Sequence, residues 1–174
     1  PGSKTALNTD TRRQIQVCIR AKKESDQKID YVVGASGSNG PFSGVWLGSR
    51  YYNAPWEVIG ATVSPYSKQN NVIMAALINA ASEKFELGIT AEPDELRILG
   101  DYWGAGYDVP DEKTYQTIYR LARTEGLFVD PTYTGKGFTA LLDLVESEKT
   151  PAGSNVLFIH TGGRGAFSNI LGLT

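Results

Sequence analysis

The sequence has one cysteine and one histidine among its 174 residues. A lone cysteine, Cys18, excludes an intrachain disulfide and a cysteine-rich zinc site. With His160 as the single histidine, a histidine-rich metal centre is excluded as well, so we expect no metal. Such sparing use of cysteine is typical of a reducing compartment, and we expect a cytoplasmic protein.

The sequence also has no strong excess of either charge and no long apolar run. The 17 basic and 19 acidic residues nearly balance, which argues against nucleic acid as a partner because that partner requires a basic face. No apolar run approaches the roughly 18 residues of a membrane span, and no secretory leader opens the sequence. The chain begins at Pro1, which favours a fragment of a longer protein. We expect one globular domain over residues 1–174.

Short β-branched runs alternate with segments of helical periodicity. Strands are predicted at 31–33, 57–64, 95–100, 127–129 and 156–159. Helices are predicted at 8–27, 43–52, 69–86, 112–125 and 136–148. Asp111 is a candidate N-cap for the fourth helix, and Gly126 marks its end. Alternation of this kind predicts an α/β fold, a three-layer αβα domain with a largely parallel sheet.

Ligands of parallel sheets bind at the edge where the carboxyl ends of the strands meet. Three loops rich in glycine or hydroxyl groups follow predicted strands there, at 34–44, 130–136 and 160–163. The first contains Ala35-Ser36-Gly37-Ser38-Asn39-Gly40, whose glycines allow successive N–H groups to converge on an anion at a helix N-terminus. An ordinary turn between strand and helix is the alternative, since the loop is neither a Walker motif nor a clean GxGxxG.

Tyr133 and Thr134 are neighbours in the second loop and can present a phenol and a hydroxyl at the same edge. A phenol has a pKa of about 10 and can act as general acid or base where a nearby cation lowers that pKa. The alternative is a tyrosine that packs its ring and bonds its hydroxyl locally. Lys136 is expected to be a solvated residue at the start of the next helix.

His160, in the third loop, is interpreted as a supporting residue, because no second histidine and no nucleophile elbow accompany it. Tyr102 and Trp103 are expected to pack in the core or a lid. Tyr107 is the exception in that segment, because Gly104 and Gly106 leave it room to approach a ligand.

Four stretches, in this order and spacing, resemble one known family: ASGSNG after a strand, GYDVP, LARTEGLFVDPTYTGK and NVLFIHTGG. The family comprises D-cysteine desulfhydrases and aminocyclopropane-carboxylate deaminases, pyridoxal-phosphate (PLP) enzymes of fold type II. The resemblance runs from about residue 31 to 167 and is most specific at 121–136. It implies the large-domain part of the tryptophan synthase β-like fold, PLP as cofactor, a small amino acid as substrate, and a homodimer of the full-length protein.

The resemblance also implies roles for single residues. The tyrosines of the family's GYGVP and DPVYTGK segments correspond to Tyr107 and Tyr133, which are implied to be catalytic. Thr134 is implied to face the pyridine nitrogen of PLP. The remaining implied cofactor contacts are the phosphate-cradling loop and the last glycine segment: Ser36, Gly37, Ser38, Asn39, Gly40, Thr161 and Gly162.

Two positions favour the desulfhydrase branch of the family. Its deaminases carry Glu after the tyrosine and Leu in a final HLGG, where this chain has Thr134 and Thr161. The implied reaction is α,β-elimination of D-cysteine to pyruvate, ammonia and sulfide. Related β-substituted substrates, a deaminase-like activity, a β-replacement of the cysteine synthase kind, and a non-catalytic module that binds a phosphate-bearing ligand remain alternatives.

The sequence departs from the family pattern in three places. Pro41 replaces the usual threonine of the phosphate loop and brings neither an N–H nor a hydroxyl. Arg164-Gly165-Ala166-Phe167 follows the last glycines in place of a small-proline-small run. No GGNK-like segment with the Schiff-base lysine occurs in these 174 residues, so we expect this stretch alone to be inactive.

Overall fold

The computed structural model of the chain describes residues 28–162. The helix predicted at 8–27, Cys18 and the segment 164–167 lie outside the described residues. In chain order the elements are β1 (Tyr31–Ser36), α2 (Gly40–Tyr51), β2 (Glu57–Thr62), α3 (Lys68–Lys84), the 3-10 helix η1 (Pro93–Glu95), β3 (Arg97–Leu99), α4 (Glu112–Thr124), α5 (Thr134–Glu146) and β4 (Val156–Ile159).

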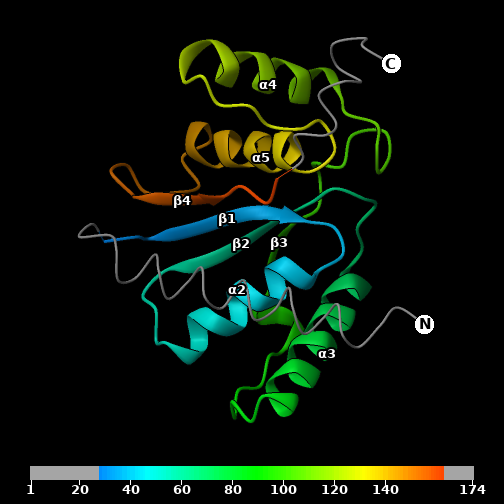
Figure 1. The fold of residues 1–174 in the computed structure, drawn as a ribbon, viewed down its shortest axis with the longest axis vertical. Helices are drawn as coiled ribbons and strands as arrows, with labels where there is room; N and C mark the ends of the chain where they lie inside the picture. Colours follow the sequence, from blue (N-terminus) through cyan, green and yellow to red (C-terminus); the bar gives the residue numbers. More distant parts are fainter. Residues whose placement is uncertain (1–27, 163–174) are drawn as a thin grey trace.

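All four strands belong to one parallel sheet with the order β3-β2-β1-β4. β1 and β2 pair along their whole length, from Tyr31 opposite Glu57 to Ser36 opposite Thr62. Helices α2 and α3 lie on one face of the sheet, and α5 lies on the other with α4 outside it (Figure 1). The predicted three-layer αβα architecture is therefore confirmed.

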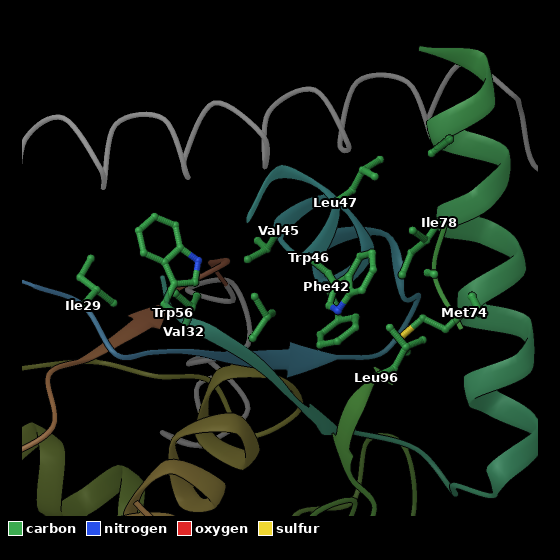
Figure 2. Close-up of a cluster of buried hydrophobic side chains, with 14 residues drawn as sticks. Ile29, Val32, Phe42, Val45, Trp46, Leu47, Trp56, Met74, Ile78 and Leu96 are labelled. Carbon is green, nitrogen blue, oxygen red and sulfur yellow. The ribbon is translucent and has the colours of Figure 1, made fainter. Parts of the chain in front are cut away.

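Both faces of the two central strands are buried, which explains why their sequences are apolar almost throughout. Successive residues point to opposite faces. Val32 and Val58 pack toward α2 and α3, whereas Val33 and Ile59 pack against α5. Figure 2 shows the larger cluster, on the α2 and α3 side. Its labelled members are Ile29, Val32, Phe42, Val45, Trp46, Leu47, Trp56, Met74, Ile78 and Leu96.

Helix α4 begins and ends as its sequence predicts. The Asp111 carboxylate accepts hydrogen bonds from the backbone N–H of Thr114 at 2.8 Å and from its hydroxyl at 2.7 Å. Gly126 follows the helix with a φ of 62°, the left-handed conformation in which glycine is favoured. No helix in residues 28–162 combines the length and the apolar character needed to cross a bilayer.

Two predictions about elements are wrong in detail. Residues 127–129 pair with none of the described strands; Val129 is buried with Ile118 and Leu121 between α4 and α5, so the apolar run fills a helix interface. The helix predicted from residue 43 begins at Gly40 instead, with Pro41 in its first turn. Proline is tolerated there because a first-turn N–H has no partner within the helix.

Candidate active site

The carboxyl ends of β1 and β4 lie side by side at one edge of the sheet. From β1 the chain passes through the glycine loop (residues 36–40) into α2 on one face, whereas β4 is reached from α5 on the opposite face. The chain extends the sheet from β1 to β2 and β3 on one side and adds β4 on the other, so the strand order reverses between β1 and β4. In open parallel sheets, ligands bind at such a switch point.

The glycine loop is packed so closely at Gly37 that a side chain there would force a neighbouring side chain to move. A Cβ on Gly37 would lie 2.9 Å from Val63 Cγ2 and 3.3 Å from Tyr133 Cε1. Asn39 has a φ of 65°, and its side-chain oxygen accepts a hydrogen bond from the Ser36 hydroxyl at 3.2 Å. The loop is thus curled, with the ring of Tyr133 beside it.

Helix α2 presents its N-terminus to this loop. Within the described residues, the side chain of its N-cap, Asn39, makes no capping hydrogen bond. First-turn N–H groups have no partner within the helix and suit an anion such as a phosphate. Pro41 removes one of those donors, but the hydroxyl of Ser38 is exposed next to the turn. With the close cradle at Gly37, the loop fits the phosphate of PLP.

Asp130 fixes the first turn of α5. Its carboxylate is 1% exposed and accepts the backbone N–H groups of Thr132, Tyr133 and Thr134 at 2.9, 2.7 and 2.8 Å. The Thr134 hydroxyl donates to the same carboxylate at 2.6 Å and accepts from the Asp130 N–H at 2.9 Å. Thr134 is therefore fully buried and bonded to Asp130, and its implied place at a pyridine nitrogen stays a prediction.

The two candidate catalytic tyrosines are brought together, although 26 positions separate them in sequence. The rings of Tyr107 and Tyr133 meet edge to face, with centroids 5.7 Å apart and planes at 81°. Tyr107 is 49% exposed, whereas Tyr133 is half-buried against the glycine loop at Gly37. Tyr133 thus stands beside the glycine loop, and Tyr107 packs against its ring.

Lys136 is fully buried, so its prediction as a solvated residue is wrong. Its Nζ donates to the carbonyl oxygens of Trp103, Gly106 and Tyr107 at 2.8, 2.8 and 3.0 Å. Burial lowers the pKa of Lys136, while the nearby carboxylates of Asp111, Asp108 and Asp130 oppose that change. Because three acceptors require all three N–H groups, this geometry corresponds to the charged ammonium.

A sequence signal for this burial does exist. Lys136 stands between two glycines at which an added Cβ would press against a neighbouring backbone atom. A Cβ on Gly135 would lie 2.5 Å from the Asp130 carbonyl oxygen, and one on Gly137 would lie 3.2 Å from the backbone nitrogen of Ala35 in β1. A helical turn pressed this closely against its surroundings on both sides of a lysine leaves that lysine little access to water.

The third loop follows β4. The Nδ1 of His160 accepts the Gly162 N–H at 3.2 Å, so its Nε2 carries the proton and donates to the Phe128 carbonyl oxygen at 2.9 Å. Backbone groups therefore engage both ring nitrogens, in agreement with a supporting residue. Thr161 is exposed and, with Pro41, lines a small apolar cavity of about 20 Å³ between α2 and the ends of β1 and β4.

Comparison with known proteins agrees with this geometry. The family model described as pyridoxal-phosphate dependent enzyme matches residues 8–162. A Pyrococcus abyssi protein provisionally named 1-aminocyclopropane-1-carboxylate deaminase is 39% identical over 141 residues, which cover 81% of this chain and 41% of that protein. A D-cysteine desulfhydrase of Yersinia enterocolitica is 36% identical over 146 residues, covering 83% and 43%. The chain thus spans less than half the length of these two relatives.

Solved structures place the fold in the same group. The crystal structure of an ACC deaminase homologue superposes with a TM-score of 0.81 at 28% identity, covering 94% of this chain and 50% of that one. Threonine deaminase isoform 2 of Solanum lycopersicum has a TM-score of 0.59 at 11% identity, which shows the fold alone. The resemblance seen in the sequence motifs is confirmed, and the chain belongs to the family of pyridoxal-phosphate-dependent enzymes.

Proposed function

We propose that the complete protein, meaning the longest natural chain that contains this sequence, catalyses PLP-dependent α,β-elimination on a small amino acid. The favoured substrate is D-cysteine, and the products are pyruvate, ammonia and sulfide. The family and two of its relatives, the provisionally named deaminase and the desulfhydrase, support the reaction class. Thr134 and Thr161, in place of the deaminase Glu and Leu, support the desulfhydrase branch.

One observation carries this proposal. Tyr133 packs against the glycine loop at Gly37 and meets Tyr107 edge to face, so a pair of phenols begins at the loop that fits a phosphate. An elimination needs a group that gives or takes a proton next to the bound amino acid, and a phenol is suited to that task.

In this proposal each part of the site has its own role. The glycine loop and the N-terminus of α2 bind the phosphate group. Asp130 holds the backbone of the α5 turn, and so the position of Tyr133, through its hydrogen bonds to three successive N–H groups. Tyr133 moves a proton at the substrate, and Tyr107 covers it from the open side. PLP, when bound, withdraws electrons from the substrate's α-carbon.

Turnover of D-cysteine by the complete protein tests the proposal, with sulfide and pyruvate measured together. Loss of general acid–base catalysis costs about 10²–10⁴-fold, so Tyr133→Phe should lower kcat by that order. Tyr119→Phe is the matched control, because Tyr119 is an exposed tyrosine on the outer helix α4 and stacks only with Arg123 among the described contacts. A Tyr133→Phe enzyme with full rate would remove Tyr133 from this role.

A deaminase is the second candidate, supported by the provisionally named Pyrococcus relative. It predicts that 1-aminocyclopropane-1-carboxylate releases ammonia at a higher kcat/KM than D-cysteine releases sulfide. Measuring both substrates on the same preparation decides between the two branches, and a protein that binds PLP but turns over neither of these nor other β-substituted amino acids is a non-catalytic binding module.

Two further expectations of the sequence belong to this proposal. We propose that the complete protein is a homodimer, because full-length members of the resembled family tend to be homodimers, and that it is cytoplasmic. Sedimentation of the complete protein measures the first, and fractionation of the source cells measures the second.

A further inference from the structure

The segment 103–107, which carries Tyr107, is held to helix α5 by a single ammonium group. The segment contains no helix and no strand of the sheet, yet three of its carbonyl oxygens converge on Lys136 Nζ within 3.0 Å. It also closes on itself: Gly104 has a φ of 66°, and a Cβ there would lie 2.5 Å from the Val109 carbonyl oxygen. The segment that carries Tyr107 is thus bonded to α5 through Lys136.

Lys136 lies where its charge needs other groups to stabilise it. It lies in the first turn of α5, where the positive end of the helix dipole disfavours a cation, so its charge depends on the three carbonyls and the surrounding carboxylates. The next residue, Gly137, brings this turn against Ala35 of β1, one residue before the glycine loop. Lys136 therefore connects the segment that carries Tyr107 to a helical turn that contacts β1, the strand that leads into the glycine loop.

A second tie, a hydrogen bond, joins the residues that are adjacent in sequence to the two tyrosines. The hydroxyl of Thr132, which precedes Tyr133, donates to the carboxylate of Asp108, which follows Tyr107. This hydrogen bond connects the two segments independently of Lys136.

We propose that Lys136 is a positioning residue that holds Tyr107 edge-on against Tyr133 through the carbonyls of 103–107, and that the Asp108–Thr132 bond is a second tie between the same two segments. The kinetic part of this proposal rests on the proposed function above. The tie itself is a property of the folded protein and is measured without substrate.

Hydrogen exchange in the complete protein tests the tie directly. In Lys136→Met, which keeps the apolar stem and removes the ammonium, amides at 103–109 should exchange at least about tenfold faster by local opening, while those of β1 keep their rate. Lys113→Met is the matched control, because Lys113 is an exposed lysine with one surface ion pair, to Asp143. Unchanged exchange at 103–109, or equally accelerated exchange in β1, would overturn the positioning role.

The second tie provides variants that keep the buried lysine in place. Thr132→Val should accelerate exchange at 103–109 by a smaller factor than Lys136→Met. Asp108→Gly should add nothing in the Thr132→Val background, because both remove the same bond. Accelerations that multiply would show that Asp108 and Thr132 act separately and would refute the second tie. These variants also keep the proposal testable should Lys136→Met not fold.

Kinetics then show whether Lys136 acts through Tyr107. Lys136→Met should lower kcat for D-cysteine about tenfold or more, with KM changed less than about threefold, and should cost less than about twofold in a Tyr107→Phe background. Losses that multiply would show that Lys136 acts by another route and would overturn the proposal. A parent protein without turnover would refute the proposed function alone, since the exchange measurements still decide the tie.

Discussion

Replacing Gly37 with alanine tests the geometry of the candidate site most directly. The added methyl group would lie 2.9 Å from Val63 Cγ2 and 3.3 Å from the ring of Tyr133. Val63 cannot move away easily, because it is fully buried and its backbone N–H is bonded to the Ser36 carbonyl oxygen at 3.2 Å. The half-buried ring of Tyr133 has more freedom, so we expect the substitution to displace Tyr133.

The magnitude follows from two opposing effects. Overpacking a closely packed site costs about 1–3 kcal/mol. Alanine restricts the unfolded chain and returns about 0.4–1 kcal/mol where the backbone conformation suits it. The free energy of unfolding should therefore fall by roughly 1–2 kcal/mol for Gly37→Ala. If PLP binding requires Tyr133 in its original position, returning the ring to that position costs binding free energy. Each ~1.4 kcal/mol of this cost weakens PLP binding about tenfold.

Gly40→Ala is the matched control for the stability measurement. It lies in the same loop at the first residue of α2, and its added methyl group would meet nothing closer than Ser38 Oγ at 3.9 Å. Thermal unfolding and PLP titration, both followed by fluorescence in the complete protein, measure the two effects. Gly40→Ala should unfold at or above the parent temperature, and Gly37→Ala below it with weaker PLP binding. Equal behaviour of the two variants would refute the close contact among Gly37, Val63 and Tyr133.

Two predictions concern groups outside the glycine loop. Asp111→Ala should destabilise the protein by about 0.5–2 kcal/mol through loss of the α4 cap, and Asp111→Asn by less. Burial raises the pKa of Asp111, but hydrogen bonds from Thr114 outweigh burial and leave that pKa below its usual value. The stability that Asp111 contributes is therefore present above pH about 4 and lost as pH falls through the lowered pKa. Unfolding of the parent and the two variants from pH 3 to 7 measures the loss of the cap and its pH dependence. Burial, with the charges of Asp143 and Asp101, raises the pKa of Tyr102 to about 12. Its contribution to stability should be complete below pH about 10 and lost between about 10 and 12, which absorbance at 295 nm checks against Tyr102→Phe.

The sheet and its helices could be predicted because their signals are local and repeated. β1 and β2 are apolar at nearly every position, which only strands covered on both faces require. Asp111 and Gly126 mark the ends of α4 by their own backbone preferences. The segment 127–129 is wrongly predicted as a strand because a short apolar run also suits a helix interface, and Val129 is buried between α4 and α5.

The arrangement of the candidate site was only partly predictable. That Tyr107 and Tyr133 meet could be inferred from the family resemblance, but not from their own neighbourhoods in the sequence. The burial of Lys136 was missed because a lysine is rarely buried unless it is paired. Its partners are carbonyl oxygens about 30 positions away, which the sequence does not reveal, so the two flanking glycines are the one local signal of its burial.

The helix N-termini explain why an anion would bind at the glycine loop and not elsewhere in the described residues. At α5 the carboxylate of Asp130 already accepts the N–H groups of the first turn, and Asp111 does the same at α4. At α3, Asn70 closes a capping box with Ser67. Only the cap of α2 differs.

Among the four described α-helices, α2 is the one whose start has neither a capping carboxylate nor a capping box. The side chain of its N-cap, Asn39, accepts a hydrogen bond from Ser36 instead of a first-turn N–H. Pro41 lies in that same turn, where a missing N–H costs the helix nothing and costs a bound phosphate one donor. Pro41→Thr should therefore strengthen PLP binding while leaving α2 intact, because it adds a donor at the one helix start that is open to an anion.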